Sequence, residues 1–181
     1  AWHRTSEASG HSEKYGMNSQ FARLDKFEDP WFVSSFNQGL NFTARPPIKR
    51  VLCLGSNRGN ELAHIAKLIP GTETLVGLDH SPSAIEAAQR SLSSPRFDFR
   101  VFDLKDIERL TDDPFDLIVA INTLHSPSLD GQSIFRWLIR HKLTPGGGLI
   151  LGFPNSRYID HHLHFGARVK NYSHPELSVL F

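Results

Sequence analysis

The stretch that decides the fold is residues 51–61, which read Val51-Leu52-Cys53-Leu54-Gly55-Ser56-Asn57-Arg58-Gly59-Asn60-Glu61. The first four residues are apolar, which is typical of a buried strand. A turn of small residues follows the strand. Apolar residues then recur at helical spacing, at Leu62, Ile65, Ala66 and Ile69. The sequence therefore predicts a strand, a sharp corner and a helix in direct succession.

The corner between this strand and helix is a candidate binding site. Gly55 and Gly59 allow positive φ or a close approach of backbone to a ligand, and Asn57 also tolerates the left-handed region. The helix that starts beside the corner offers free N–H groups and a positive dipole end to an anionic group. An ordinary strand–turn–helix corner shares this pattern, so the corner alone does not establish a site.

Length and composition favour one α/β domain in a reducing compartment. The 181 residues suffice for a single core, and the formal net charge of +1 gives no overall drive toward nucleic acid or anionic membranes. Cys53 is the only cysteine, which excludes an internal disulfide. No apolar run approaches the roughly 18 residues of a membrane span, and the first residues lack the apolar core of a secretory signal. We therefore expect a cytoplasmic protein without a membrane partner.

Strand and helix patterns alternate five times along the chain. Strands are predicted at residues 51–54, 74–78, 97–102, 115–121 and 149–153, with helical segments between them. This alternation predicts a doubly wound, mostly parallel sheet flanked by helices. Right-handed crossovers bring the strand-to-helix loops to one edge of such a sheet, where ligands bind. Asp79, Asp103 and residues 122–125 would meet the glycine corner there.

The flanking segments carry weaker patterns. Residues 1–20 are interpreted as an irregular arm, and residues 21–181 as a single domain with its core at 49–154. Asp29 and Pro30 predict a helix start, with Trp31, Phe32 and Phe36 on one face. This helix would cover the domain edge or act as a lid. After residue 153 the pattern fades, and no clear strand candidate follows.

In this order the motifs resemble those of the class I S-adenosylmethionine-dependent methyltransferases, which have a Rossmann-like fold. The resemblance covers residues 49–154. It rests on Leu-x-Leu-Gly-x-x-x-Gly at 52–59, Asp79, Asp103-Leu104, Phe-Asp-Leu-Ile at 115–118 and Leu-Thr-Pro-Gly-Gly at 143–147. It implies an enzyme with S-adenosylmethionine as cofactor. It also implies two further strands in a C-terminal hairpin, for which this chain has no clear candidates.

The resemblance also implies a set of cofactor contacts. Gly55, Ser56, Asn57 and Gly59 would lie against the methionine end. Asp79 would accept hydrogen bonds from the ribose hydroxyls, with His80 beside it. Asp103 and Leu104 would contact the adenine, and Asn122 would lie near the cofactor at the end of the fourth strand.

The chain departs from the family pattern at two positions. Cys53 stands where members often carry an acid, and Asn57 stands where they often carry a second glycine. The missing acid removes a polar anchor near the methionine amino group. We expect Cys53 to be a buried thiol rather than a nucleophile.

The expected reaction is methyl transfer to an unidentified acceptor, with a small molecule favoured and RNA kept as an alternative. His125 is the candidate general base, because it follows the fourth strand and its ordinary pKa is near neutrality. A non-catalytic methyltransferase-like binding module is an alternative. A nucleotide-dependent oxidoreductase is another, although residues 56–60 break its Gly-x-Gly-x-x-Gly spacing. No metal is expected, because the histidines at 161, 162 and 164 lack an evident partner set. The oligomeric state is not indicated.

Overall fold

The computed structural model describes residues 25–43, 47–153, 156–159 and 162–165. Five strands form one sheet in the order β3-β2-β1-β4-β5, and every pairing is parallel. The strands are β1 (Arg50–Leu54), β2 (Thr74–Asp79), β3 (Phe97–Val101), β4 (Phe115–Ile121) and β5 (Leu143–Gly152). The predicted doubly wound, mostly parallel, Rossmann-like sheet is confirmed. The strand order reverses between β1 and β4, and ligands of such sheets bind beyond the carboxyl ends of the strands at this point.

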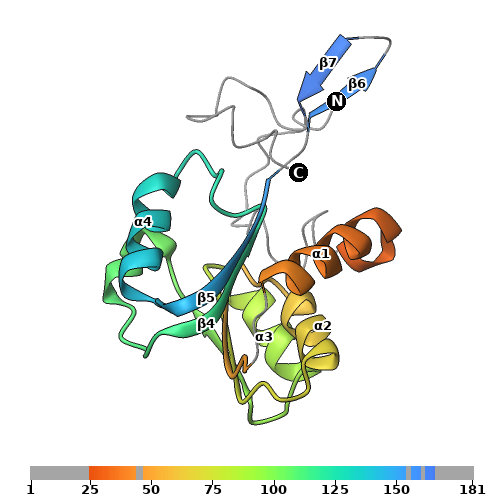
Figure 1. The fold of residues 1–181 in the computed structure, drawn as a ribbon. Helices are drawn as coiled ribbons and strands as arrows, with labels where there is room; N and C mark the ends of the chain where they lie inside the picture. The colour runs from red at the N-terminus through yellow and green to blue at the C-terminus, as the bar shows by residue number, and fades with distance from the viewer. Residues whose placement is uncertain (1–24, 44–46, 154–155, 160–161, 166–181) are drawn as a thin grey trace.

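Helices cover both faces of the sheet (Figure 1). Side chains of a strand alternate between the faces, so Val51 and Cys53 lie on one side and Leu52 and Leu54 on the other. The first face packs against α1 (Pro30–Thr43), α2 (Asn60–Leu68) and α3 (Pro82–Ser91). The second packs against the 3₁₀ segment η3 (Leu104–Arg109) and α4 (Gly131–His141). The sheet is therefore buried on both sides, so a ligand can reach it only at the loops beyond the strand ends.

Helix α1 begins where the sequence predicted. The Asp29 Oδ1 atom accepts a hydrogen bond of 2.9 Å from the backbone N–H of Trp31. Phe36 is buried, as expected, and so is Leu40, but Trp31 is 82% exposed. The prediction that Trp31 shares the buried face was wrong, because Phe32, Phe36 and Leu40 repeat every four residues and Trp31 lies about 100° around the helix from Phe32.

The segment before α1 packs on the same face as α2. It contains the short helix η2 (Lys26–Glu28), whose Phe27 ring contacts the rings of Phe32, Phe36 and His64. The ring centroids of Phe27 and His64 are 4.6 Å apart, and those of Phe27 and Phe36 are 5.7 Å apart. These contacts join η2, α1 and α2 at the edge of the domain. The predicted arm at residues 1–20 lies outside the described residues.

The C-terminal part of the sheet departs from the prediction. Strand β5 starts at Leu143, whereas the sequence predicted 149. Phe115 pairs with Leu143, and the next pair is Leu117 with Gly148. One residue of β4 therefore lies opposite residues 144–147 of β5, which form a bulge. Gly146, within the bulge, has a φ of +80°.

Two more strands follow, although no clear strand candidate was recognised after residue 153. Strands β6 (Ser156–Ile159) and β7 (His162–Phe165) pair as an antiparallel hairpin in a sheet of their own. The signal was present in the sequence, because residues 162–165 alternate polar and apolar types as a strand does.

No helix in the described part of the chain is long and apolar enough to cross a membrane.

Candidate functional site

The glycine corner between β1 and α2 has the backbone conformations that its sequence predicted. The φ angles are +65° at Gly55, +46° at Asn57 and +81° at Gly59. A Cβ atom on Gly55 would lie 2.3 Å from Thr123 Oγ1, and one on Gly59 would lie 2.6 Å from Cζ of Phe99. Glycine is therefore needed at both positions for two reasons: the positive φ disfavours other residues, and the neighbouring side chains leave no space for a Cβ atom.

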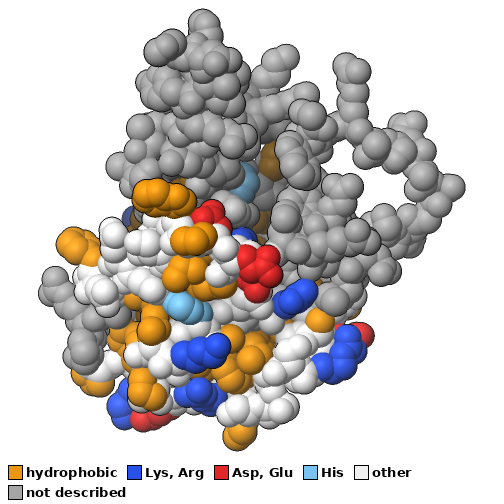
Figure 2. Space-filling view, turned by 90° about the vertical axis from the view of Figure 1, so that its right-hand side faces the viewer, with side chains coloured by type: hydrophobic (Ala, Val, Ile, Leu, Met, Phe, Trp, Pro, Cys, Tyr) orange, Lys and Arg blue, Asp and Glu red, His pale blue; other side chains and the backbone are white. Residues whose placement is uncertain are grey.

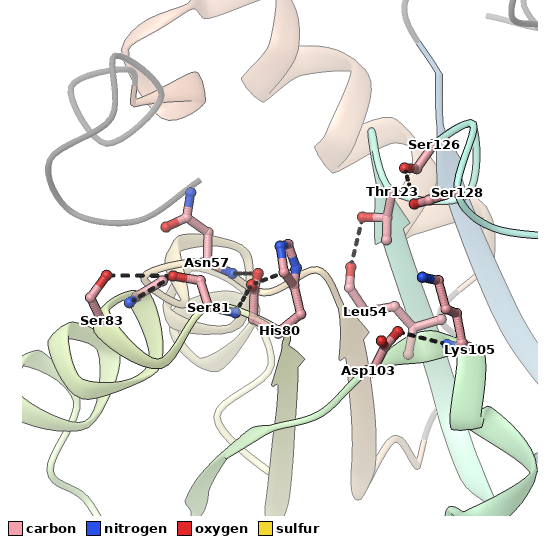
Figure 3. A network of polar contacts seen from close by, with 12 residues as sticks. Leu54, Asn57, His80, Ser81, Ser83, Asp103, Lys105, Thr123, Ser126 and Ser128 are labelled. Atoms are coloured by element: carbon pink, nitrogen blue, oxygen red, sulfur yellow. Dashed lines mark hydrogen bonds and ion pairs between the residues drawn. The ribbon is translucent and has the colours of Figure 1, made fainter. Parts of the chain in front are cut away.

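Asp79 joins this corner to the turn after β2. It is the last residue of β2 and is 7% exposed. Its Oδ2 atom accepts a hydrogen bond of 2.9 Å from the Asn57 backbone N–H, and its Oδ1 atom accepts one of 3.0 Å from the Ser81 N–H. Figure 3 shows these contacts meeting between the corner and the start of α3. Because each carboxylate oxygen has two acceptor positions, each can still accept a bond from a ligand.

His80 lies directly beside this carboxylate. Its Nδ1 atom is 3.5 Å from Asp79 Oδ1, and its side chain is 61% exposed. In Figure 3 the His80 ring and the Asn57 side-chain amide both project beyond the ends of the strands. The two residues therefore present polar groups on the side of the corner where a ligand would approach.

The third strand also ends at this edge. The Phe102 N–H donates to the Asp79 carbonyl oxygen at 2.8 Å and holds the two strand ends together. Asp103 follows, is exposed, and accepts a bond of 3.0 Å from the Lys105 N–H at the start of η3. Leu104 is 7% exposed and packs into the core, so its side chain mainly supports the loop.

The loop after β4 completes the edge. Asn122 is exposed with a φ of +55°, and its N–H donates to the Gly152 carbonyl at 2.7 Å. The Thr123 hydroxyl lies over Gly55 and donates to the Leu54 carbonyl at 3.0 Å. These bonds bring the ends of β1, β4 and β5 together. The structure thus gathers the predicted glycines, Asp79, Asp103 and Asn122 on one edge of the sheet.

Two predicted site residues are less exposed than the sequence suggested. Ser56 is fully buried, and its Oγ would lie 2.9 Å from a Cβ atom built on Gly77, so its side chain faces β2 beneath the corner. His125 is partly buried in the loop after β4, and this burial lowers the pKa of its imidazole below the ordinary value. The His125 ring is therefore neutral at pH 7, which is the form that a general base needs.

Sequence reasoning missed two residues of this edge. Thr123 was placed in the right loop, but its contact with Gly55 could not be foreseen. Glu61, the second residue of α2, is 4% exposed and accepts a bond of 3.0 Å from Lys26 Nζ. Glu61 precedes the apolar stripe of α2, and spacing alone does not distinguish it from a solvent-facing acid.

Cys53 is a buried thiol, as predicted. It is 1% exposed within β1, and its pKa is raised chiefly by burial and further by the nearby charge of Glu61. A thiol in this state is a poor nucleophile. Within the described residues no three His, Cys, Asp or Glu side chains converge on a metal position.

Comparison with known proteins gives a family and several solved structures. A family model described as a methyltransferase domain matches residues 51–147. No curated protein matches the sequence. An S-adenosylmethionine-dependent methyltransferase from Thiobacillus denitrificans, in complex with S-adenosyl-L-homocysteine, has 21% identity and a TM-score of 0.59, with 82% of this chain and 57% of that chain covered. Its counterpart from Geobacter sulfurreducens, with the same ligand, has 23% identity and a TM-score of 0.57, with 74% and 52% covered.

A third solved structure carries a different activity on the same fold. The [4+2]-cyclase SpnF has 22% identity and a TM-score of 0.59, with 75% of this chain and 50% of that chain covered. This chain therefore spans between 50% and 57% of the length of the three structures. At these identities the likeness concerns the fold alone, and function has to be argued from the site.

Proposed function

The chain belongs to the methyltransferase-domain family, and from this premise we propose that it binds S-adenosylmethionine and transfers a methyl group to a small-molecule acceptor. The observation that carries the proposal is the position of Asp79. Its two carboxylate oxygens are fixed by the Asn57 and Ser81 N–H groups, and each keeps acceptor capacity. A pair of fixed acceptors at the end of β2 fits the two neighbouring hydroxyls of a ribose.

The other residues of the edge fit the remaining parts of the same cofactor. The backbone at residues 55–59 lies beside the Asp79 carboxylate and would accept the methionine end in close approach. Asp103 and Leu104 follow the adjacent strand, where they would contact the adenine. Asn122 follows β4, which pairs with β1 on the side away from β2, so it would approach the cofactor from the side opposite Asp79. When bound, the cofactor supplies a methyl group on a positively charged sulfur.

The work left to the protein is to orient an acceptor and to remove its proton. Holding an acceptor in line at near-attack distance accounts for much of the catalysis in such a reaction. His125 is the residue that we assign to proton removal, because it follows β4 and its lowered pKa keeps it neutral at pH 7. Ser56 lies beneath the corner and would contribute by supporting its backbone.

A calorimetric titration tests the proposal directly. The intact chain is titrated with S-adenosylhomocysteine, the demethylated product, and separately with NAD. We expect binding of the first and none of the second, since the corner lacks the Gly-x-Gly-x-x-Gly spacing. Failure to bind S-adenosylhomocysteine would remove the proposed function. Tight binding of NAD would instead support the oxidoreductase alternative.

If His125 removes the proton of the acceptor, its replacement should lower kcat and leave the affinity for the cofactor product unchanged. Against an acceptor found by screening a small-molecule panel, His125→Asn should lower kcat about a hundredfold, which is typical of a lost general base. Affinity for S-adenosylhomocysteine should stay within about twofold, because the base acts on the acceptor.

The pH profile gives the control for this prediction. Burial lowers the pKa of His125, so the fall of the wild-type rate on the acidic side of the profile should lie at a lower pH than for an ordinary histidine. The variant should lack this acidic limb. An unchanged limb in His125→Asn would assign the proton transfer to another group.

The distribution of charge favours a small acceptor over RNA. On the face formed by α1, α2 and α3, basic side chains are interspersed with acidic and hydrophobic ones (Figure 2). Basic side chains of the described residues are also engaged in ion pairs, such as Lys49 with Glu73 and Arg90 with Glu86. A nucleic-acid surface usually presents clustered, unpaired cations. A salt-dependent RNA-binding assay checks this assignment.

A non-catalytic binding module is the second candidate. It is favoured by the two backbone hydrogen bonds of Asp79, which would serve the fold even without a ligand. The [4+2]-cyclase adds that proteins of this fold also carry activities other than methyl transfer. Binding of S-adenosylmethionine without methylation across a broad acceptor panel would select this candidate.

A further inference from the structure

An ion pair of unusual burial lies beside the glycine corner. Glu61 Oε1 accepts a bond of 3.0 Å from Lys26 Nζ, and the side chains are 6% and 36% exposed respectively. A second polar contact runs in parallel, from Asn60 Nδ2 to Asp25 Oδ1 at 3.0 Å. The two contacts attach the segment before α1 to the first turn of α2, directly after Gly59.

The burial of Glu61 calls for a reason. Taking a carboxylate out of water is costly, and a single ion pair often fails to repay it. Among the described residues only Glu61 and Asp79 are buried carboxylates. Glu61 is the second residue of α2, which begins directly after Gly59. Asp79 accepts a hydrogen bond of 2.9 Å from the Asn57 N–H, so both acids flank the glycine corner.

The pair has capacity left for a ligand. Oε1 of Glu61 is bound to Lys26, and no described residue donates a hydrogen bond to Oε2. Lys26 has three N–H donors, and Glu61 takes one of them. The pair can thus accept from a cation at Glu61 and donate to an anion at Lys26 without breaking its own contact.

We propose that the Lys26/Glu61 pair binds the amino-acid head group of the cofactor's methionine. An amino-acid head group carries an ammonium and a carboxylate on one carbon, so a glutamate next to a lysine presents the complementary charges. Glu61 accepts from the ammonium, and Lys26 donates to the carboxylate. The ribose at Asp79 places this end of the molecule over the corner. The inference rests on the proposed function. Glu61 in α2 and Lys26 in η2 would bind the methionine head group, which the Cys53 thiol cannot do in place of the family's acid.

The test compares two ligands that differ only at this end. S-adenosylhomocysteine carries the head group, whereas 5′-methylthioadenosine keeps the adenosine and sulfur without it. By calorimetry, Glu61→Gln and Lys26→Met should each lower affinity for S-adenosylhomocysteine about tenfold or more, the effect of one lost charged hydrogen bond. Affinity for 5′-methylthioadenosine should stay within about twofold.

The exposed pair of Lys49 and Glu73 supplies the matched control. Its Nζ–Oε1 distance is 2.8 Å, and its side chains are 55% and 62% exposed. Lys49→Met and Glu73→Gln should leave both affinities unchanged, because such a surface pair contributes little.

A charge exchange separates ligand binding from a purely structural role. The double variant Lys26→Glu/Glu61→Lys restores a pair of opposite charges, so a merely structural pair would regain affinity for S-adenosylhomocysteine. We expect that affinity to stay low, because the charges then oppose the head group. Recovery in the exchange, equal losses for both ligands, or no loss in Glu61→Gln would each overturn the inference. Wild-type protein that binds neither ligand would overturn the proposed function as well.

Discussion

Replacing Asp79 by alanine should lower the affinity for S-adenosylhomocysteine at least a hundredfold. The carboxylate is the group assigned to both ribose hydroxyls, and two charge-assisted hydrogen bonds are together worth about 3 kcal/mol or more. The loss should be the same for 5′-methylthioadenosine and adenosine, because all three ligands carry the ribose. This common loss distinguishes Asp79 from the Lys26/Glu61 pair, whose variants should affect only the ligand with a head group. Calorimetry with the three ligands makes the measurement.

The structural role of Asp79 has to be separated from its role in binding. Alanine leaves the N–H groups of Asn57 and Ser81 without the acceptor they have in the structure, which costs about 1–3 kcal/mol for each group that stays buried. Affinities should therefore be measured well below the melting temperature of the variant. Asp116→Ala is the control, since Asp116 Oδ2 also accepts two backbone N–H bonds, from Lys49 at 2.8 Å and Arg50 at 2.9 Å, but at the start of β4, away from the proposed site. A folded Asp79→Ala protein that binds within about threefold of wild type would contradict the ribose assignment.

The parts of the site that were predicted share a local origin. A glycine is needed where φ is positive, and an acid at the end of β2 follows directly from the strand pattern, so residues 55–59 and Asp79 could be read from short stretches. Parallel strands bring their carboxyl ends to one edge, which placed Asp103 and Asn122 beside them. The alternation of strands and helices accordingly sufficed to predict the five parallel strands of the main sheet.

The parts that were missed depend on contacts between distant segments. Glu61 and Lys26 are 35 residues apart, and Thr123 reaches the Leu54 carbonyl across 69 residues. No periodicity encodes such pairs. Trp31 shows a related limit, because apolar character alone did not reveal which face of α1 would meet the sheet. The bulge in β5 likewise reflects pairing with β4 and not a feature of its own sequence.

Replacing Gly59 by alanine should lower the free energy of unfolding by about 2–4 kcal/mol, the sum of a strained left-handed residue and an overpacked contact. Gly59 has a φ of +81°, and an added Cβ would lie 2.6 Å from the Phe99 ring and 3.0 Å from Leu92 Cδ1. Phe99 is buried between β2 and α3 and cannot move away without loss of packing. The corner would be displaced from the core, so affinity for S-adenosylhomocysteine should fall in parallel. Urea unfolding and calorimetry measure the two effects.

Alanine variants of two other glycines separate the two causes of the lost stability, backbone strain and the close contact. Gly146 has a φ of +80° with nothing within 4 Å of an added Cβ, so Gly146→Ala should show the backbone strain alone, about 1 kcal/mol. Gly71 has neither a positive φ nor a neighbour within 4 Å, so Gly71→Ala should be neutral or slightly stabilising. The difference between Gly59→Ala and Gly146→Ala then measures the contact with Phe99. If the two variants lose the same stability, the contact with Phe99 adds nothing to the backbone strain, and close packing does not hold the corner in place.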